Sequence, residues 1–204
     1  PTWPENDYME LGQYLSREAN CDFTFLHPEA LRTCTVRDGK LILDNRHVQE
    51  YRAVILPGMR TISAGSLQKL AEFAKSGGTL VAVTELPSHS AEFGRDGEIR
   101  DLCNRLFGRT AIGERAEKKA HPAGGTCWCV PMHAYAALPE ILSGKTDTEV
   151  LKKVPGLQWI RKRGEREVWL FASLKQDADT RVRICGRWEL RGMDPRTGEE
   201  IALQ

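Results

Sequence analysis

The sequence lacks a long hydrophobic run, so we predict no membrane-spanning helix in it. No apolar stretch among its 204 residues approaches the roughly 18 residues that such a helix needs, and we expect no signal peptide. An excess of one charge sign is also lacking, because 29 Lys and Arg stand against 28 Asp and Glu. That balance gives no field to attract nucleic acid or an anionic membrane, so we predict neither as a partner. Because the chain begins at Pro1 rather than Met, we expect a processed product or an excised piece.

Cysteine is too scarce, at six residues, to form a disulfide scaffold. Four cysteines stand singly, where a cysteine is usually a small buried hydrophobe: Cys21, Cys34, Cys103 and Cys185. Cys127 and Cys129 form a C-x-C pair in a predicted strand, whose alternation directs both thiols to one face and Trp128 to the other. His121 and His133 are the nearest further ligands, and this spacing fits no standard zinc pattern. We therefore predict no metal site.

One stretch in the first half has the pattern of a βαβ unit. The continuous apolar run over 53–56 predicts a strand buried on both faces. A helix follows, capped by Ser63 or Ser66 and ended by the glycines at 77–78. A second buried strand is predicted over 79–83. Because crossovers between parallel strands are almost always right-handed, this unit predicts an α/β domain with a parallel sheet.

Further elements surround this unit. Helical spacing of apolar residues predicts helices over 7–20, 28–31, 99–107 and 134–150. Alternation predicts a strand over 21–26, and the Asp38–Gly39 pair predicts a hairpin over 35–43. The polar stretch over 109–125 indicates a loop or an edge hairpin.

The character of the sequence changes beyond residue 156. Short strands without helical periodicity are predicted there, over 157–161, 167–172, 181–184 and 187–190. A chain of this length suits one large domain or two small ones. We predict an α/β domain over 1–150 and an antiparallel β segment over 151–204, which is the start or a part of a β-sandwich.

The candidate ligand-binding residues are Glu85, Ser88 and His89, in the loop over 84–90. This loop follows the second parallel strand, and open α/β sheets bind ligands at the C-terminal ends of their strands. A Ser/His/acid hydrolase would need its nucleophile on a G-x-S-x-G elbow, which this loop lacks. A ligand contact and an ordinary solvated loop are therefore the main alternatives, and no catalytic residue is predicted. The residues over 58–65 carry no nucleotide-binding motif, so no cofactor is predicted either.

The order of the segments resembles a known family. The run Tyr51-Arg-Ala-Val-Ile-Leu-Pro57 follows an Asp-Gly-Lys-Leu hairpin, and Met193-Asp-Pro-Arg-Thr-Gly198 lies near the end. The other segments, in order, are 23–31, 36–43, 77–81, 159–163 and 168–172. This series resembles the region after the catalytic barrel in glycoside hydrolases of family 106, the α-L-rhamnosidases. The resemblance implies a flavodoxin-like domain, similar to class I glutamine amidotransferases and to the β-galactosidase trimerisation domain, that leads into β-sandwich domains.

The sequence departs from this family at several points. The family's first sheet strand, which precedes position 22, has no counterpart, and Met193 stands where the family has Trp. The catalytic barrel is not in this chain, so its carboxylates and metal ligands correspond to no residue here. No cysteine occupies a strand-to-helix elbow, since Cys103 falls within a predicted helix, so amidotransferase activity is not implied.

The leading hypothesis is a non-catalytic accessory region that supports the barrel, the sugar site or a subunit contact. The partner would be the catalytic barrel of the same polypeptide. The alternative is a stand-alone module that binds a carbohydrate or small polar ligand through the 84–90 loop and Trp159 or Trp188. A small hydrolase in its own right is a third hypothesis, without a catalytic constellation to support it. The resemblance suggests a bacterial protein outside the cytoplasm, whereas the scattered cysteines favour a reducing compartment, so the compartment is left open.

Overall fold

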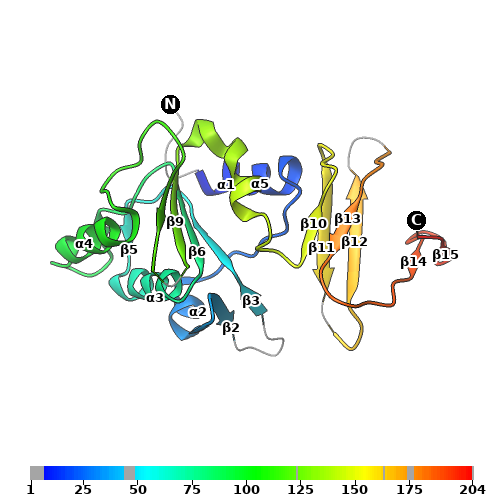
Figure 1. Ribbon diagram of the computed structural model, residues 1–204, viewed down its shortest axis with the longest axis horizontal. Helices are drawn as coiled ribbons and strands as arrows, with labels where there is room; N and C mark the ends of the chain where they lie inside the picture. Colours follow the sequence, from blue (N-terminus) through cyan, green and yellow to red (C-terminus); the bar gives the residue numbers. More distant parts are fainter. Residues whose placement is uncertain (1–6, 44–48, 123, 163, 174–176, 204) are drawn as a thin grey trace.

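The chain folds into a mixed α/β body followed by small antiparallel sheets, as seen in a computed structural model that describes residues 7–43, 49–122, 124–162, 164–173 and 177–203. The body is built on a four-stranded sheet in the order β4-β6-β9-β8 (Figure 1). Its strands are β4 (Ala53–Leu56), β6 (Thr79–Val83), β9 (Thr126–Val130) and β8 (Glu117–Ala120). The first three strands are parallel and β8 is antiparallel to β9, so the edge-hairpin alternative for 109–125 is confirmed.

The predicted βαβ unit is confirmed. All five residues of β6 are buried, and α3 (Ala64–Lys75) connects β4 to β6. Helix α3 begins after Ser63, whose hydroxyl accepts a hydrogen bond from the backbone N–H of Ser66 at 3.2 Å, and this bond satisfies one of the free donors at the helix start. The cap is thus Ser63 and not Ser66, which is the alternative that sequence left open.

Helices cover both faces of the sheet (Figure 1). One core contains Leu80 and Ala82 of β6 with α2 (Pro28–Thr33), α3 and α4 (Asp96–Phe107). The other contains Val81 and Val83 with α1 (Asp7–Gln13), the π-helical turn η2 (Tyr14–Glu18), the 3₁₀ helix η3 (Met132–Ala137) and α5 (Leu138–Leu142). Alternation along β6 thus supplies both cores. No helix in the described residues is both long and apolar enough to span a bilayer.

Two smaller sheets flank the body. One contains β1 (Thr35–Arg37), β2 (Lys40–Leu43) and β3 (Gln49–Tyr51), and the other pairs β5 (Thr61–Ile62) with β7 (His89–Ser90). The predicted hairpin over 35–43 is confirmed, because Asp38 and Gly39 form its turn with φ values of 51° and 70°. Two successive positive φ values match the twist of the paired strands.

The described residues of the C-terminal part form three two-stranded antiparallel sheets. They pair β10 (Thr148–Val150) with β13 (Val182–Ile184), β11 (Leu157–Lys162) with β12 (Val168–Ser173), and β14 (Gly192–Met193) with β15 (Glu200–Ile201). Its small core comprises Val150, Val154 and Leu157, with Trp159 and Phe171 packed against them. Predicted antiparallel structure is therefore present, in short pieces with little core of their own.

Four predictions about individual elements are wrong. Residues 21–26 are extended but pair with no described strand. Strand β4 is predicted to be buried on both faces, but three of its four residues are half-buried because β4 lies at the edge of the sheet. The helix predicted over 134–150 ends at Leu142, since 148–150 instead form β10 against β13. Residues 187–190 form no strand and pair with no described strand.

Candidate functional site

The predicted ligand residues lie in two separate pairs at the end of β6. The carboxylate of Glu85 accepts a hydrogen bond from Arg60 Nε at 3.2 Å. Ser88 Oγ lies 2.9 Å from His89 Nδ1, and the backbone N–H groups of both residues donate to the Arg60 carbonyl. The structure therefore brings Ser88 and His89 together and holds Glu85 on Arg60. His89 is exposed, and within the described residues it contacts Ser88 and no carboxylate.

A buried polar network lies at the same edge of the sheet, where β4, β6 and β9 end. Asp7 accepts hydrogen bonds from the Tyr135 hydroxyl and from the backbone N–H of Gly58, the latter at 2.8 Å. The Tyr135 hydroxyl also lies 3.2 Å from Thr84 Oγ1. Thr84 has a φ of 63°, which is uncommon for a β-branched residue and places it in a strained conformation at the strand end.

The chemistry of this network is that of a structural anchor. Burial raises the pKa of Tyr135 above its ordinary range, and the hydrogen bond to Asp7 raises it further. A phenol with a raised pKa stays protonated at neutral pH, so it cannot act as a base toward Thr84. Sequence reasoning missed Asp7 and Tyr135, which are 128 positions apart, because no local pattern joins them.

The C-x-C pair is arranged as predicted, and it does not form a metal site in the described residues. Cys127 and Cys129 are both buried in the core that contains α4, whereas Trp128 faces the opposite core. His121 Nε2 lies 3.3 Å from Cys127 Sγ, but no group of three His, Cys, Asp or Glu residues within the described ranges could hold a metal ion. The Cys103 thiol lies in the same core and donates to the Pro87 carbonyl at 3.3 Å.

These three thiols are held in their protonated form. Burial raises the pKa of Cys103 and of Cys127 to about 12, and that of Cys129 to about 11. Because the thiolate is the nucleophilic form of cysteine, none of the three is a nucleophile at neutral pH.

The raised pKa values predict a loss of stability at high pH. Below pH 9 a thiol is protonated in both the folded and the unfolded chain. Above pH 9 only the unfolded chain releases the proton, so the free energy of unfolding falls until the pH passes the folded pKa. At pH 10.5 the raised pKa of Cys103 accounts for a fall of about 2 kcal/mol in the free energy of unfolding. Between pH 7.5 and 10.5 the free energy of unfolding of Cys103→Ala should therefore fall by about 2 kcal/mol less than that of the wild type. Urea unfolding under reducing conditions measures both.

A matched control is Leu102→Ala, which also removes a buried side chain from α4 but carries no titratable group. Leu102→Ala should lower the free energy of unfolding by similar amounts at both pH values. Equal pH dependence of Cys103→Ala and the wild type would contradict the raised pKa.

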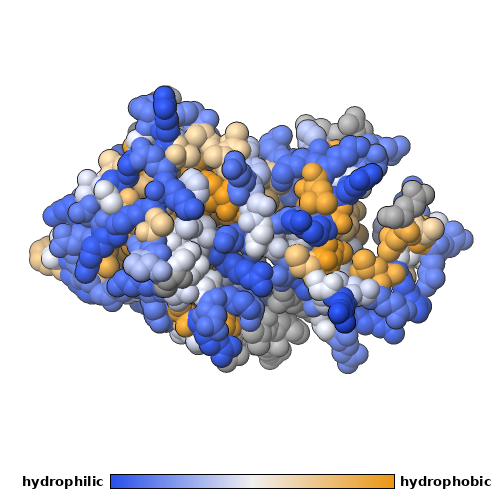
Figure 2. All heavy atoms as spheres, in the orientation of Figure 1, coloured by the Kyte–Doolittle hydropathy of each residue, from blue (hydrophilic) through white to orange (hydrophobic). Residues whose placement is uncertain are grey.

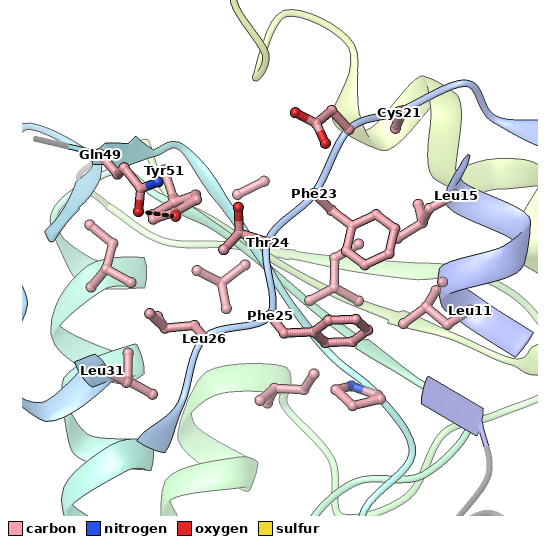
Figure 3. A pocket seen from close by; sticks show the side chains of 18 of the residues that line it. Leu11, Leu15, Cys21, Phe23, Thr24, Phe25, Leu26, Leu31, Gln49 and Tyr51 are labelled. Atoms are coloured by element: carbon pink, nitrogen blue, oxygen red, sulfur yellow. Dashed lines mark hydrogen bonds between the residues drawn. The ribbon is translucent and has the colours of Figure 1, made fainter. Parts of the chain in front are cut away.

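A further candidate site lies away from the predicted loop. A cavity of about 1030 Å³ separates β4 from the extended residues 21–26, and none of Glu85, Ser88 or His89 lines it. Figure 3 shows Phe23 and Phe25 directed toward Leu11 and Leu15 of the first helical segment. We call this cavity the edge groove. Its centre is apolar, and its charged lining residues lie mainly toward the start of β4: Asp22, Glu50, Arg52, Lys145, Asp147, Arg161 and Lys162.

The two tryptophans considered for sugar stacking differ in their surroundings. Trp159 is half-buried, stacks on Phe171 with ring centroids 6.1 Å apart, and donates from Nε1 to the Asn20 carbonyl at 2.8 Å. Trp159 is therefore part of the core. Trp188 is exposed and makes an edge-to-face contact with Trp169 at 5.3 Å.

Comparison with known proteins assigns no family to this arrangement. No protein-family model matches the chain, and no curated protein matches it either.

Proposed function

We propose that this chain is a non-catalytic accessory region of a large glycoside hydrolase that resembles the α-L-rhamnosidases. In this proposal the α/β body is a flavodoxin-like domain, and the C-terminal sheets belong to a β-sandwich that is completed by other protein. The enzyme class is supported by the order of the sequence segments. The accessory role is supported by one observation in particular, the apolar outer face of the β11–β12 hairpin.

The apolar residues of this outer face are Ile160, Val168 and Leu170. The pairing register places Ile160 opposite Leu170, and Lys162 opposite Val168, on the side of the hairpin that faces solvent. The exposed fractions of the three side chains are 56% for Ile160, 56% for Val168 and 48% for Leu170. Figure 2 shows hydrophobic atoms gathered over this part of the molecule.

The inner face of the same hairpin is already covered. Trp159 and Phe171 pack on the small C-terminal core, and Arg161 forms ion pairs with Asp147 and Glu167. A two-stranded sheet with apolar residues on both faces is marginal in water unless a second layer covers each face. A packing role for the outer face accounts for these residues, whereas a free surface does not.

The candidate sites also favour binding or packing over catalysis. Buried thiols with raised pKa values, an anchored Tyr135 and the separated Glu85 and Ser88–His89 pairs give no nucleophile with an adjacent base and orienting carboxylate.

The mass of the native gene product tests this proposal. An accessory region predicts a product several times larger than 22.9 kDa, with a barrel-sized segment that carries rhamnosidase activity. A native product of 22.9 kDa, or hydrolysis of a nitrophenyl α-L-rhamnoside by the isolated chain, would contradict the proposal.

A surface variant tests the packing face directly. The double substitution Ile160→Lys and Leu170→Glu should reduce binding of a hydrophobic dye, because it places two charges of opposite sign on the outer face, directly opposite each other. The free energy of unfolding should change by less than about 0.5 kcal/mol, since both side chains are exposed in the isolated chain. Thr110→Lys, at an exposed position of the α/β body, is the control that should leave dye binding unchanged. A large loss of stability in the double variant would show that the face is already covered.

A stand-alone carbohydrate-binding module is the second candidate, and the exposed ring of Trp188 is the observation that favours it. Calorimetry with L-rhamnose separates the two candidates. The accessory proposal predicts no heat of binding by the isolated chain, whereas a module predicts heat that is lost in Trp188→Ala.

A further inference from the structure

The sheet of the α/β body has an open edge along β4. In the parallel pairing with β6, the Arg52 carbonyl accepts from the Thr79 N–H, and residues of the same parity along β4 face β6. The N–H and C=O groups of Ala53 and Ile55 therefore face away from β6. In the described part of the chain, no strand pairs with this side of β4.

The edge groove lies against this open edge. Its opposite wall is the extended segment 21–26, whose side chains alternate between the helical side and the α2 side (Figure 3). Phe25 is 71% exposed and Phe23 is 37% exposed, although both are directed toward the apolar side chains of the first helix. The groove is thus bounded by two extended segments with apolar side chains between them.

The directions of these segments are fixed by contacts to α1. Asp7, at the start of α1, binds the backbone N–H of Gly58 just beyond the end of β4, so the helix starts at the C-terminal end of that strand. Phe23 and Phe25 lie near Gly12, in the same helix, after the chain has turned at Asn20. Segment 21–26 therefore runs back along the helix, in the same direction as β4.

This arrangement is that of a strand–helix–strand unit whose first strand is not among the described residues. A helix antiparallel to its neighbouring strands, followed by an extended segment parallel to them, normally follows a parallel strand in the same sheet. The start of α1 at Asp7 is where such a strand would enter the helix. The position between β4 and 21–26 is the edge groove.

We propose that the edge groove is the seat of one further β-strand, parallel to β4, which is supplied by the polypeptide that leads into α1. This strand would pair with Ala53 and Ile55 on one side and with segment 21–26 on the other, at a strand spacing of about 4.8 Å. Its residues are apolar at successive positions, because helices lie on both faces of the sheet there.

The proposal is independent of the enzyme class proposed above, because it rests on the sheet edge alone. A peptide strand is favoured over a small molecule because the edge presents backbone donors and acceptors at regular spacing, which only another backbone pairs throughout. Once seated, the strand would give segment 21–26 the β partner that its alternation predicts.

Hydrogen exchange on fusions of the full chain tests the proposal. One fusion carries the apolar strand Lys-Val-Val-Ile-Val-Val-Asn directly before Pro1, and the control carries Lys-Ser-Asn-Gly-Ser-Asn-Asn. We expect the amide protection of Ala53 and Ile55 to be about tenfold or more higher in the apolar fusion, with a melting temperature several degrees higher. Equal protection in the two fusions would overturn the proposal.

Two further measurements test whether the added strand pairs with the β4 edge and whether the polypeptide leading into α1 supplies it. Ala53→Pro removes an N–H that faces the groove and leaves the pairing to β6 intact, so it should abolish the gain of the apolar fusion. If that variant fails to fold, the proposal is still tested by comparing the amide protection of Ile55 between the apolar fusion and the control fusion. Protection by the apolar strand added as a free peptide, without protection in the fusion, would overturn a covalent source leading into α1.

Discussion

Replacing Asn20 by alanine is expected to lower the free energy of unfolding by about 4 kcal/mol. The Asn20 side chain is 2% exposed and joins the first helical segment to the C-terminal part. Its Nδ2 donates to the carbonyls of Val154 at 3.0 Å and Leu157 at 2.8 Å, and its Oδ1 accepts from the Val154 N–H at 3.0 Å. Alanine would leave these three buried backbone groups without partners, and each such group costs roughly 1–3 kcal/mol. Urea unfolding followed by tryptophan fluorescence measures the loss.

The backbone of Asn20 supplies a matched control. Its φ of 48° is left-handed, a conformation that asparagine and glycine tolerate better than alanine. Asn20→Gly removes the same three hydrogen bonds without the backbone cost, so it should be more stable than Asn20→Ala by about 1 kcal/mol. A loss below about 1 kcal/mol in both variants would mean that water replaces the lost bonds, which would contradict the role of Asn20 as a buried clamp.

The parts of the fold that sequence predicted correctly are local or repeat a short period. The strands β4 and β6 and the helix α3 follow from continuous apolar runs, a serine cap and terminal glycines, all within about 30 residues. The orientation of Cys127 and Cys129 follows from alternation within one strand. These elements can therefore be predicted without knowledge of the distant elements that pack against them.

The parts that sequence could not predict depend on partners far along the chain. Alternation predicts a strand over 21–26, but a strand also needs a neighbour, and the place beside this segment is the edge groove. The apolar run of β4 predicts burial on both sides, yet its burial depends on that same neighbour. At the site, the loop over 84–90 could be predicted from its place after a strand. Asp7 and Tyr135 could not, because only the fold brings them together.

Replacing Tyr135 by phenylalanine is expected to lower the free energy of unfolding by about 3 kcal/mol. The Tyr135 hydroxyl donates to the buried carboxylate of Asp7, whose other bond comes from the Gly58 N–H. Without the hydroxyl, one oxygen of this carboxylate is left without its donor in a buried site. A buried charged group that loses its partner costs more than a neutral one. Thr84→Val removes the weaker neighbour of the hydroxyl at 3.2 Å and should cost about 1 kcal/mol.

The pH dependence of the stability of Tyr135→Phe distinguishes a lost hydrogen bond from a lost packing contact. Burial and the bond to Asp7 raise the pKa of Tyr135 above its ordinary value near 10. Its stabilisation is therefore complete below pH 10 and falls as the pH rises further, because only the unfolded chain then releases the phenolic proton. In Tyr135→Phe this fall above pH 10 should disappear, while the fall that begins near pH 9 from the buried thiols persists. A variant as stable as the wild type at pH 7.5, with an unchanged fall above pH 10, would show that Tyr135 does not anchor α1 through Asp7.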